Sequence, residues 1–141
     1  YKRQLVLTSG EIAKQRDLQP LAKIVATASN SQHPSEFTIA PVGAIAKVLK
    51  KAGWVAQDVD LWEINEAFAM VTMCAIDDFK LDPEKVNIHG GACALGHPVG
   101  STGSRIILTL IHALKRTGGK KGVAALCIGG GEATAVAIEL L

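Results

Sequence analysis

The sequence predicts an α/β domain, because segments with strand-like composition alternate along the chain with segments of helical periodicity. The chain has 141 residues, of which 48% are hydrophobic and 20% charged, which suits one globular domain with its own core. No repeat or low-complexity stretch divides it, so residues 1–141 are treated as one domain. Five segments are expected to be strands: 4–8, 21–28, 59–64, 123–128 and 133–140.

Four of these strands are predicted from β-branched or apolar residues bounded by turn signals. Residues 21–28 are rich in Val, Ile and Thr, and residues 59–64 alternate enough between apolar and polar to form a strand. Residues 123–128 are a continuous apolar run, and glycines 129–131 separate them from the final strand at 133–140. These strands are expected to form the sheet.

The start of the chain holds a short apolar run at 4–8 and a helical turn at 11–16. Strand-like residues begin almost at once after Tyr1, as if an upstream segment had been removed. The start of the chain is basic at Lys2 and Arg3, but the three apolar residues 5–7 that follow are far too few for a signal-peptide core.

Three longer segments have the apolar periodicity of helices. One begins near Pro41 and is expected to stop at Gly53, the second covers 66–79, and the third covers 101–115. In the third, apolar residues between 106 and 114 occupy nearly the whole circumference. We therefore expect a covering layer from another domain or chain, and a central core helix of a self-sufficient fold is the alternative.

Charge and cysteine content argue against several classes of protein. Fifteen Lys and Arg against thirteen Asp and Glu leave a net charge of +2, too even to indicate a nucleic-acid or membrane partner. No apolar run reaches the ~18 residues of a membrane span. Cys74, Cys93 and Cys127 are odd in number and widely spaced. Neither a disulfide framework nor a metal site is therefore expected, and a reducing compartment, the cytoplasm, is favoured.

Two polar residues stand at the ends of expected elements. Asn65 opens the run N-E-A-F-A where a strand gives way to a helix. Its carboxamide can orient a water molecule, and capping of the helix is the alternative. His97 lies between a glycine and a proline in the glycine-rich segment 90–105, just before a helix. The glycines allow a ligand to approach the imidazole, whereas a lone loop histidine is usually not catalytic.

Cys127 ends an apolar strand and comes shortly before glycines 129–131. The backbone N–H groups of such a turn can stabilise an oxyanion, and an inert buried cysteine is the alternative. A thiol has an ordinary pKa of ~8.5, and tuning toward neutrality would let it act as both acid and base. Neither a dinucleotide-binding glycine motif nor a phosphate loop is present in the sequence.

Together and in this order, these motifs resemble the thiolase family. They are N-E-A-F-A at 65–69, G-G-x-x-A-L-G-H-P-x-G-x-x-G-x-R at 90–105 and C-I-G-G-G at 127–131, and the segments 20–24 and 40–45 also fit. The similarity covers essentially the whole chain. It implies the C-terminal domain of a thiolase, with a layered α/β fold in which a mixed five-stranded sheet carries helices on both faces.

The resemblance also implies roles for four residues in acyl transfer. His97 would activate the nucleophilic cysteine, and Cys127 would be the second cysteine, which moves protons at the acyl carbon and the coenzyme-A thiol. Asn65 would hold a water that forms one oxyanion hole with His97. The Gly129 N–H would contribute to the other.

Substrate contacts are implied for two aromatic residues. Phe68 matches the aromatic that packs on the pantetheine arm, and Phe37 falls where the acyl pocket varies within the family. The implied reaction interconverts two acetyl-CoA with acetoacetyl-CoA and coenzyme A, with no cofactor besides these substrates. A 3-ketoacyl-CoA thiolase acting on longer chains is one alternative, and a non-catalytic thiolase-like binding module is another.

One departure from the family bears on activity. The family's acyl-accepting cysteine and most coenzyme-A contacts belong to an N-terminal half, and neither Cys74 nor Cys93 stands in the nucleophile motif. The 141-residue chain is therefore expected to be inactive alone. In the intact enzyme we expect it to pack on an N-terminal half and to assemble into homodimers or homotetramers.

Overall fold

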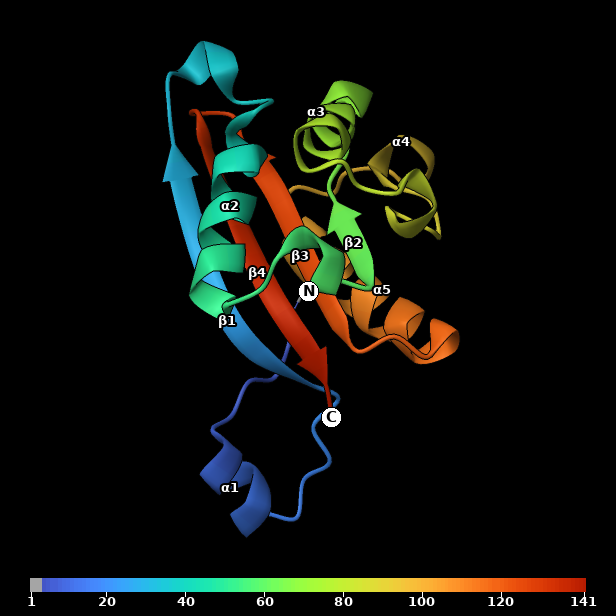
Figure 1. The fold of residues 1–141 in the computed structure, drawn as a ribbon. Coiled ribbons are helices and arrows are strands. Elements are labelled where there is room, and N and C mark those ends of the chain that lie inside the picture. The colour runs from blue at the N-terminus through green and yellow to red at the C-terminus, as the bar shows by residue number, and fades with distance from the viewer. Residues whose placement is uncertain (1–3) are drawn as a thin grey trace.

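The computed structural model describes residues 4–141; residues 1–3, part of the basic start, lie outside the described part. A four-stranded sheet forms the centre, with helices on both faces (Figure 1). The predicted α/β fold with a mixed sheet is confirmed, and the number of five strands is wrong by one. The strands are β1 (Ala22–Ser31), β2 (Leu61–Ile64), β3 (Lys121–Ile128) and β4 (Glu132–Leu140).

The strand order is β1-β4-β3-β2. β4 is antiparallel to both β1 and β3, whereas β2 runs parallel to β3. The parallel pair is fixed at both ends. At its start, the Asp60 carboxylate accepts the N–H groups of Lys120 and Lys121 at 2.7 and 2.9 Å. At its end, the Asn65 N–H donates to the Ala125 carbonyl at 2.9 Å, so Asn65 lies where the carboxyl ends of both strands meet.

The strand expected at residues 4–8 is not formed. Val6 is 95% exposed and Leu7 71% exposed, and no described strand pairs with this segment. An apolar composition makes a strand only where a neighbouring strand accepts its backbone hydrogen bonds. The helical turn that follows is confirmed as α1 (Gly10–Gln15), which begins where the Ser9 hydroxyl accepts the Ile12 N–H at 3.2 Å. α1 stands clear of the sheet (Figure 1).

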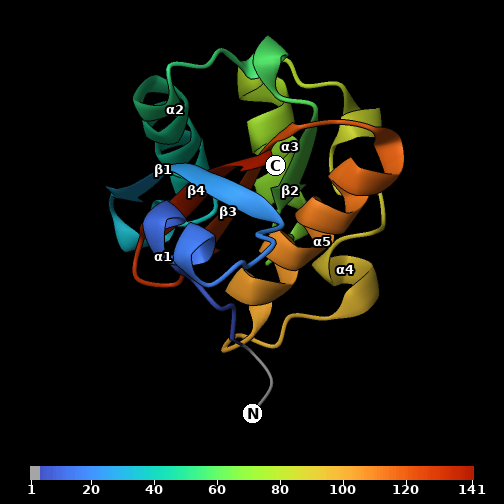
Figure 2. The ribbon, with the colours of Figure 1, turned by 90° about the horizontal axis from the view of Figure 1, so that it is seen from below.

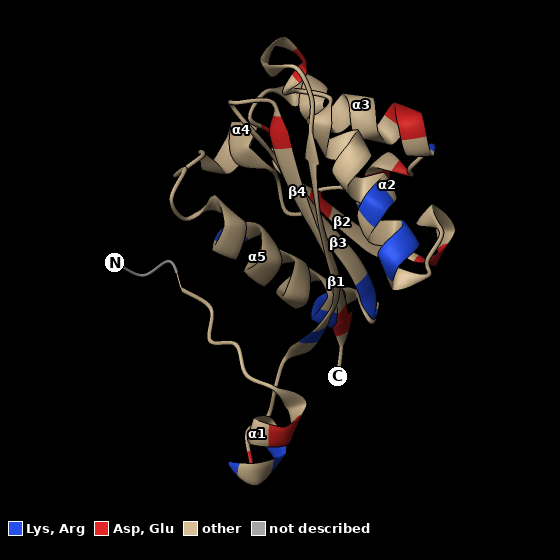
Figure 3. Ribbon diagram, turned by 90° about the vertical axis from the view of Figure 1, so that its left-hand side faces the viewer, with Lys and Arg blue, Asp and Glu red and all other residues tan. Residues whose placement is uncertain are grey.

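Helices α2 (Ala40–Ala52) and α3 (Ala69–Phe79) cover one face of the sheet, as an edge-on view shows (Figure 3). The predicted stop at Gly53 is confirmed, because Gly53 has φ +70° and its N–H bonds to the carbonyls of Leu49 and Lys50. Left-handed backbone at this position favours glycine. The buried apolar side of α2 packs on the sheet through Ala44, Ile45, Val48 and Leu49.

Helix α5 (Thr102–Thr117) covers the opposite face, as Figure 2 shows. Ile106, Leu110 and Leu114 are buried against the sheet, whereas Leu108 is 42% exposed. The alternative of a central core helix is therefore not found in this chain, while the expectation that another domain or chain covers the outer side stays a prediction. Within residues 4–141, no helix is long and apolar enough to cross a lipid bilayer.

The remaining helical pieces are short. α4 (Ala92–Leu95) is a single turn inside the glycine-rich segment that the sequence had suggested is a loop. In the described part of the chain, 3-10 turns lie at Pro34–Glu36, Ala56–Asp58 and Pro83–Lys85.

Candidate active site

The candidate site lies where β2 and β3 end. Asn65 directly follows β2 and is only 1% exposed. Cys127 is the next-to-last residue of β3. His97 is exposed on the loop between α4 and α5. Parallel pairing of β2 with β3 thus brings residues from distant parts of the sequence to the same edge of the sheet.

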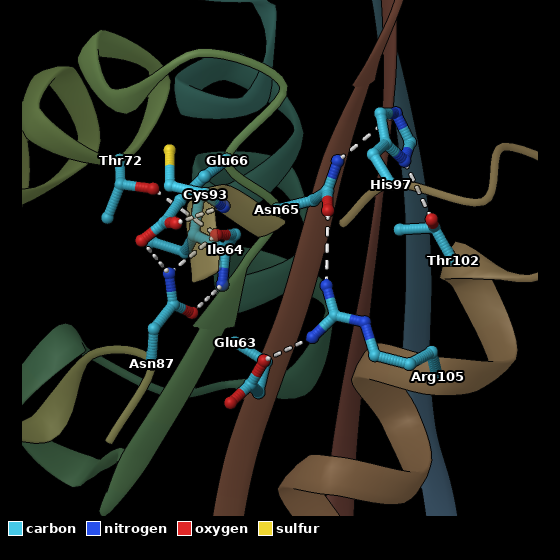
Figure 4. A network of polar contacts seen from close by, with 10 residues as sticks. All are labelled: Glu63, Ile64, Asn65, Glu66, Thr72, Asn87, Cys93, His97, Thr102 and Arg105. Carbon is cyan, nitrogen blue, oxygen red and sulfur yellow. Dashed lines mark hydrogen bonds and ion pairs between the residues drawn. The ribbon is translucent and has the colours of Figure 1, made fainter. Parts of the chain in front are cut away.

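The His97 ring has a polar neighbour at each nitrogen (Figure 4). Its Nε2 lies 3.4 Å from Asn65 Nδ2, and its Nδ1 lies 2.7 Å from Thr102 Oγ1. The Thr102 hydroxyl in turn donates to the Pro98 carbonyl at 3.3 Å. The structure therefore brings Asn65 and His97 together, as the sequence suggested, and adds Thr102, which the sequence analysis had not singled out.

Behind Asn65 lies an ion pair that sequence reasoning missed. Arg105 Nη2 donates to Asn65 Oδ1 at 3.3 Å, and Arg105 Nη1 lies 3.6 Å from Glu63 Oε2. Glu63 is 2% exposed, and its burial raises the pKa of the carboxyl to about 7. The Arg105 charge opposes that rise, and the Glu66 carboxylate adds to it. The sequence does contain an indication of this ion pair, because a carboxylate that lies between large apolar residues in a short strand is buried with them and needs a cation beside it.

A second carboxylate ties the glycine-rich loop to the end of β2. Glu66 accepts the Asn87 Nδ2 at 3.2 Å and the Cys93 N–H at 3.0 Å. Asn87 bonds both backbone groups of Ile64, each at 2.8 Å (Figure 4). Gly91 lies so close to Glu66 that a Cβ there would overlap the carboxylate. These contacts fix the start of the loop that carries His97.

Cys127 is 6% exposed and belongs to the core cluster on the α2 side of the sheet. Burial raises the pKa of the thiol, so it is protonated at neutral pH. Burial is the largest cause of the shift and outweighs a backbone hydrogen bond that lowers the pKa, so within the described residues the Cys127 thiol is not tuned toward neutrality. Within residues 4–141 no hydrogen bond joins Cys127 to His97. Gly129 lies exposed in the turn that leads to β4.

The two predicted substrate-contacting aromatics meet each other. Phe37 and Phe68 make an edge-to-face contact, with ring centroids 6.1 Å apart and an interplanar angle of 65°. Phe68 is 59% exposed at the start of α3, and Phe37 is half-buried. Together they form an apolar surface on which the exposed Phe68 ring can contact a ligand.

Cysteines and other potential metal ligands are dispersed in the described part of the chain. Within residues 4–141 no three His, Cys, Asp or Glu side chains converge on a potential metal position. The three cysteines of the chain are free thiols. The site instead offers an imidazole, a carboxamide and a buried thiol at one edge of the sheet.

Comparisons with known proteins define the class. Residues 18–140 match the family described as "Thiolase, C-terminal domain". The chain is 50% identical over 135 residues to the cytosolic acetyl-CoA acetyltransferase of Mus musculus, covering 96% of this chain and 34% of that protein.

Two solved structures have the same fold. The acetyl-CoA acetyltransferase of Bacillus anthracis matches with a TM-score of 0.91 and 49% identity, over 94% of this chain and 34% of that one. Human mitochondrial 3-ketoacyl-CoA thiolase in complex with CoA matches with a TM-score of 0.90 and 45% identity, over the same shares. The chain belongs to the thiolase family, and it spans about a third of the length of these relatives.

Proposed function

We propose that this chain supplies the base, the second cysteine and an oxyanion-binding group to the active site of an acetyl-CoA acetyltransferase. The contact between Asn65 and His97 carries the proposal. It places a potential base, the His97 imidazole, next to a hydrogen-bond donor, the Asn65 carboxamide, and both lie beside the end of β3. The intact enzyme interconverts two acetyl-CoA with acetoacetyl-CoA and free coenzyme A. The curated relative of that name, 50% identical over 135 residues, supports this reaction.

The reaction begins with acyl transfer to a cysteine of an N-terminal half. His97 takes the proton of that cysteine, whose thiolate then attacks the thioester carbon of the first acetyl-CoA. The carboxamide N–H of Asn65, through a water, and the protonated His97 stabilise the negative oxygen that forms. The departing coenzyme-A sulfur takes a proton from Cys127. An acyl-enzyme and free coenzyme A result.

The carbon–carbon bond forms in the second stage. The Cys127 thiolate, left by the first stage, removes a proton from the methyl group of the second acetyl-CoA. The resulting enolate attacks the acyl-enzyme, with the Gly129 N–H contributing to stabilisation of an oxyanion. The nucleophilic sulfur departs and recovers its proton from His97. The raised pKa of Cys127 suits this order, because the resting thiol has a proton to give before it acts as a base.

The contacts to the substrate and to other chains follow from the same proposal. Phe68 packs on the pantetheine arm of the coenzyme-A thioester, and Phe37 behind it borders the acyl pocket. An N-terminal thiolase half covers the outer face of α5, where Leu108 is exposed, and the intact enzyme forms homodimers or homotetramers. Free thiols favour a reducing compartment, and the cytosolic relative supports the cytoplasm.

The mutation that tests the role of the base is His97→Ala in the full-length protein that carries this chain. Acetoacetyl-CoA thiolysis is expected to fall by about 100-fold or more, since general-base catalysis contributes that much. His89→Ala is the matched control, because His89 is also exposed and precedes the glycine-rich segment. Near-normal turnover in the His97→Ala variant would contradict the role.

The alternative substrate class is a longer 3-ketoacyl-CoA, which the similarity to a 3-ketoacyl-CoA thiolase favours. Values of kcat/KM for the C4 thioester and for longer 3-ketoacyl-CoA thioesters separate the two. A preference for C4 supports the acetyltransferase. Absence of turnover on every chain length, with coenzyme A still bound, would indicate a binding module.

A further inference from the structure

We propose that Arg105 is a positioning residue that sets the orientation of the Asn65 carboxamide and, through it, the tautomer of His97. Arg105 lies in the first turns of α5 and has no direct contact with His97 among the hydrogen bonds of the described residues. Its effect on the reaction rests on the proposed function, whereas its effect on His97 does not.

The donor and acceptor properties of the two side chains determine the orientation of Asn65. A guanidinium has five N–H donors and no acceptor. Arg105 Nη2 lies 3.3 Å from one end of the carboxamide, so that end must be the oxygen; the NH₂ group there would set donor against donor. The other end, 3.4 Å from His97 Nε2, is therefore the NH₂ group.

The same reasoning extends to His97. Its Nε2 faces an N–H donor, so it must carry the lone pair. The Thr102 hydroxyl uses its hydrogen on the Pro98 carbonyl and therefore accepts from His97 Nδ1. All hydrogen bonds point the same way, from Arg105 through Asn65 and His97 to Thr102 (Figure 4), and the Thr102 hydroxyl passes the series on to the Pro98 carbonyl. This direction leaves neutral His97 with its basic nitrogen at Nε2.

The surroundings of Arg105 make this side chain fit for the role. Its side chain is 19% exposed, and the Glu63 carboxylate 3.6 Å away holds the guanidinium at its position. Nε and Nη1 have no hydrogen-bond acceptor among the described residues. The hydrogen bond from Nη2 to Asn65 is thus the main directional contact of this partly buried cation.

The test replaces Arg105 without leaving an unpaired carboxylate in the core. Removing one partner of a buried ion pair leaves an uncompensated charge and strongly destabilises the fold, so Arg105→Met is made in a Glu63→Gln background. Glu63→Gln alone is the reference. Glu63→Gln/Arg116→Met is the matched control, because Arg116 is an exposed arginine in the last turn of the same helix. Amide NMR spectra of the 141-residue chain confirm that each variant is folded.

The readout is the ¹⁵N chemical shift of the two His97 ring nitrogens, recorded at about pH 8.5. The chain has four histidines, and the His97 signals are those lost in His97→Gln. In the reference, Nδ1 is expected at the shift of a protonated nitrogen and Nε2 at that of an unprotonated one. In Glu63→Gln/Arg105→Met the two shifts are expected to converge, because both tautomers become populated.

Two results would overturn the proposal. One is an unchanged pair of His97 shifts in the folded Arg105→Met variant. The other is an equally large effect of Arg105→Met when Asn65→Ala is also present, because Arg105 would then act by a route other than Asn65. Convergence that vanishes in the Asn65→Ala background supports it.

Kinetics of the full-length protein separate this proposal from the proposed function. With the tautomer disturbed, kcat is expected to fall about tenfold relative to the Glu63→Gln reference, with KM within about twofold. If no variant of the full-length protein shows thiolase turnover, but the two His97 shifts still converge in Glu63→Gln/Arg105→Met, the proposed function is wrong and the positioning role of Arg105 is supported.

Discussion

Glu63→Gln should change the pH dependence of stability by a measurable amount. Glu63 is 2% exposed, and burial raises its pKa from the ordinary 4.5 to about 7. In the unfolded chain the carboxyl loses its proton near pH 4.5, while in the folded chain it keeps the proton until about pH 7. Between these values the folded state binds more protons, so the free energy of unfolding falls as pH rises.

The size of the effect follows from the difference between the two pKa values. At about 1.4 kcal/mol per pH unit, that difference corresponds to about 3 kcal/mol between pH 4.5 and pH 7. The wild-type chain should thus lose about 3 kcal/mol relative to Glu63→Gln across this window, because glutamine does not titrate. The Arg105 charge, which favours the ionised carboxylate, and the Glu66 carboxylate, which opposes it, are both included in the raised value.

The assay is urea denaturation of both proteins at several pH values from about 4.5 to 8. Contributions of all other groups cancel in the difference between the two curves. Glu11→Gln is the matched control, since Glu11 is an exposed carboxylate in the first turn of α1, and it should leave the pH dependence nearly unchanged. Parallel curves for wild type and Glu63→Gln would refute the reasoning, as would a difference that grows in the opposite direction.

Three further outcomes are expected. Cys127→Ser in the full-length protein should impair carbon–carbon bond formation more than acyl transfer, so labelled acyl-enzyme should still be trapped; a folded variant that forms no acyl-enzyme would contradict the assigned role. The 141-residue chain alone should show no thiolase turnover, which a coenzyme-A release assay checks, and should self-associate through its exposed apolar faces, which light scattering checks. A monomer that turns over acetoacetyl-CoA would refute both expectations. Gly131→Ala should lower the free energy of unfolding by at least about 1–2 kcal/mol in urea denaturation, because Gly131 has φ +97° and a Cβ there would overlap the Gln32 carbonyl. Gly10→Ala is the control, since a Cβ at Gly10 meets open space. Equal stability of the two variants would contradict this reasoning.

Local signals predicted much of the fold. Pro41 and Gly53 delimit α2 because a proline suits the first turn and a left-handed residue ends the helix, and neither depends on distant residues. The strand expected at residues 4–8 fails for the opposite reason. A strand exists only with a partner, and the composition of five residues does not show whether one is present.

The candidate site divides in the same way. The motifs around Asn65 and His97 indicated that both belong to one site, and the structure places them 3.4 Å apart. The Glu63–Arg105 ion pair escaped notice because alternation suggested a half-exposed strand, whereas all four residues of β2 are buried. Burial on both faces comes from packing of the helices, which the strand sequence alone does not reveal. The raised pKa of Cys127 was not predictable from the sequence for the same reason, since it depends on how deeply β3 is buried.

The parallel ladder between β2 and β3 has a consequence for how the protein folds. Leu61 pairs with Gly122, and the segment between them contains α3, α4 and α5. Closing so long a loop is slow compared with forming the β3–β4 hairpin, because chain entropy is lost before the contact is gained. During synthesis, β2 leaves the ribosome long before β3 exists. Asn65 therefore reaches its final position only after β3 has been translated and has paired with β2.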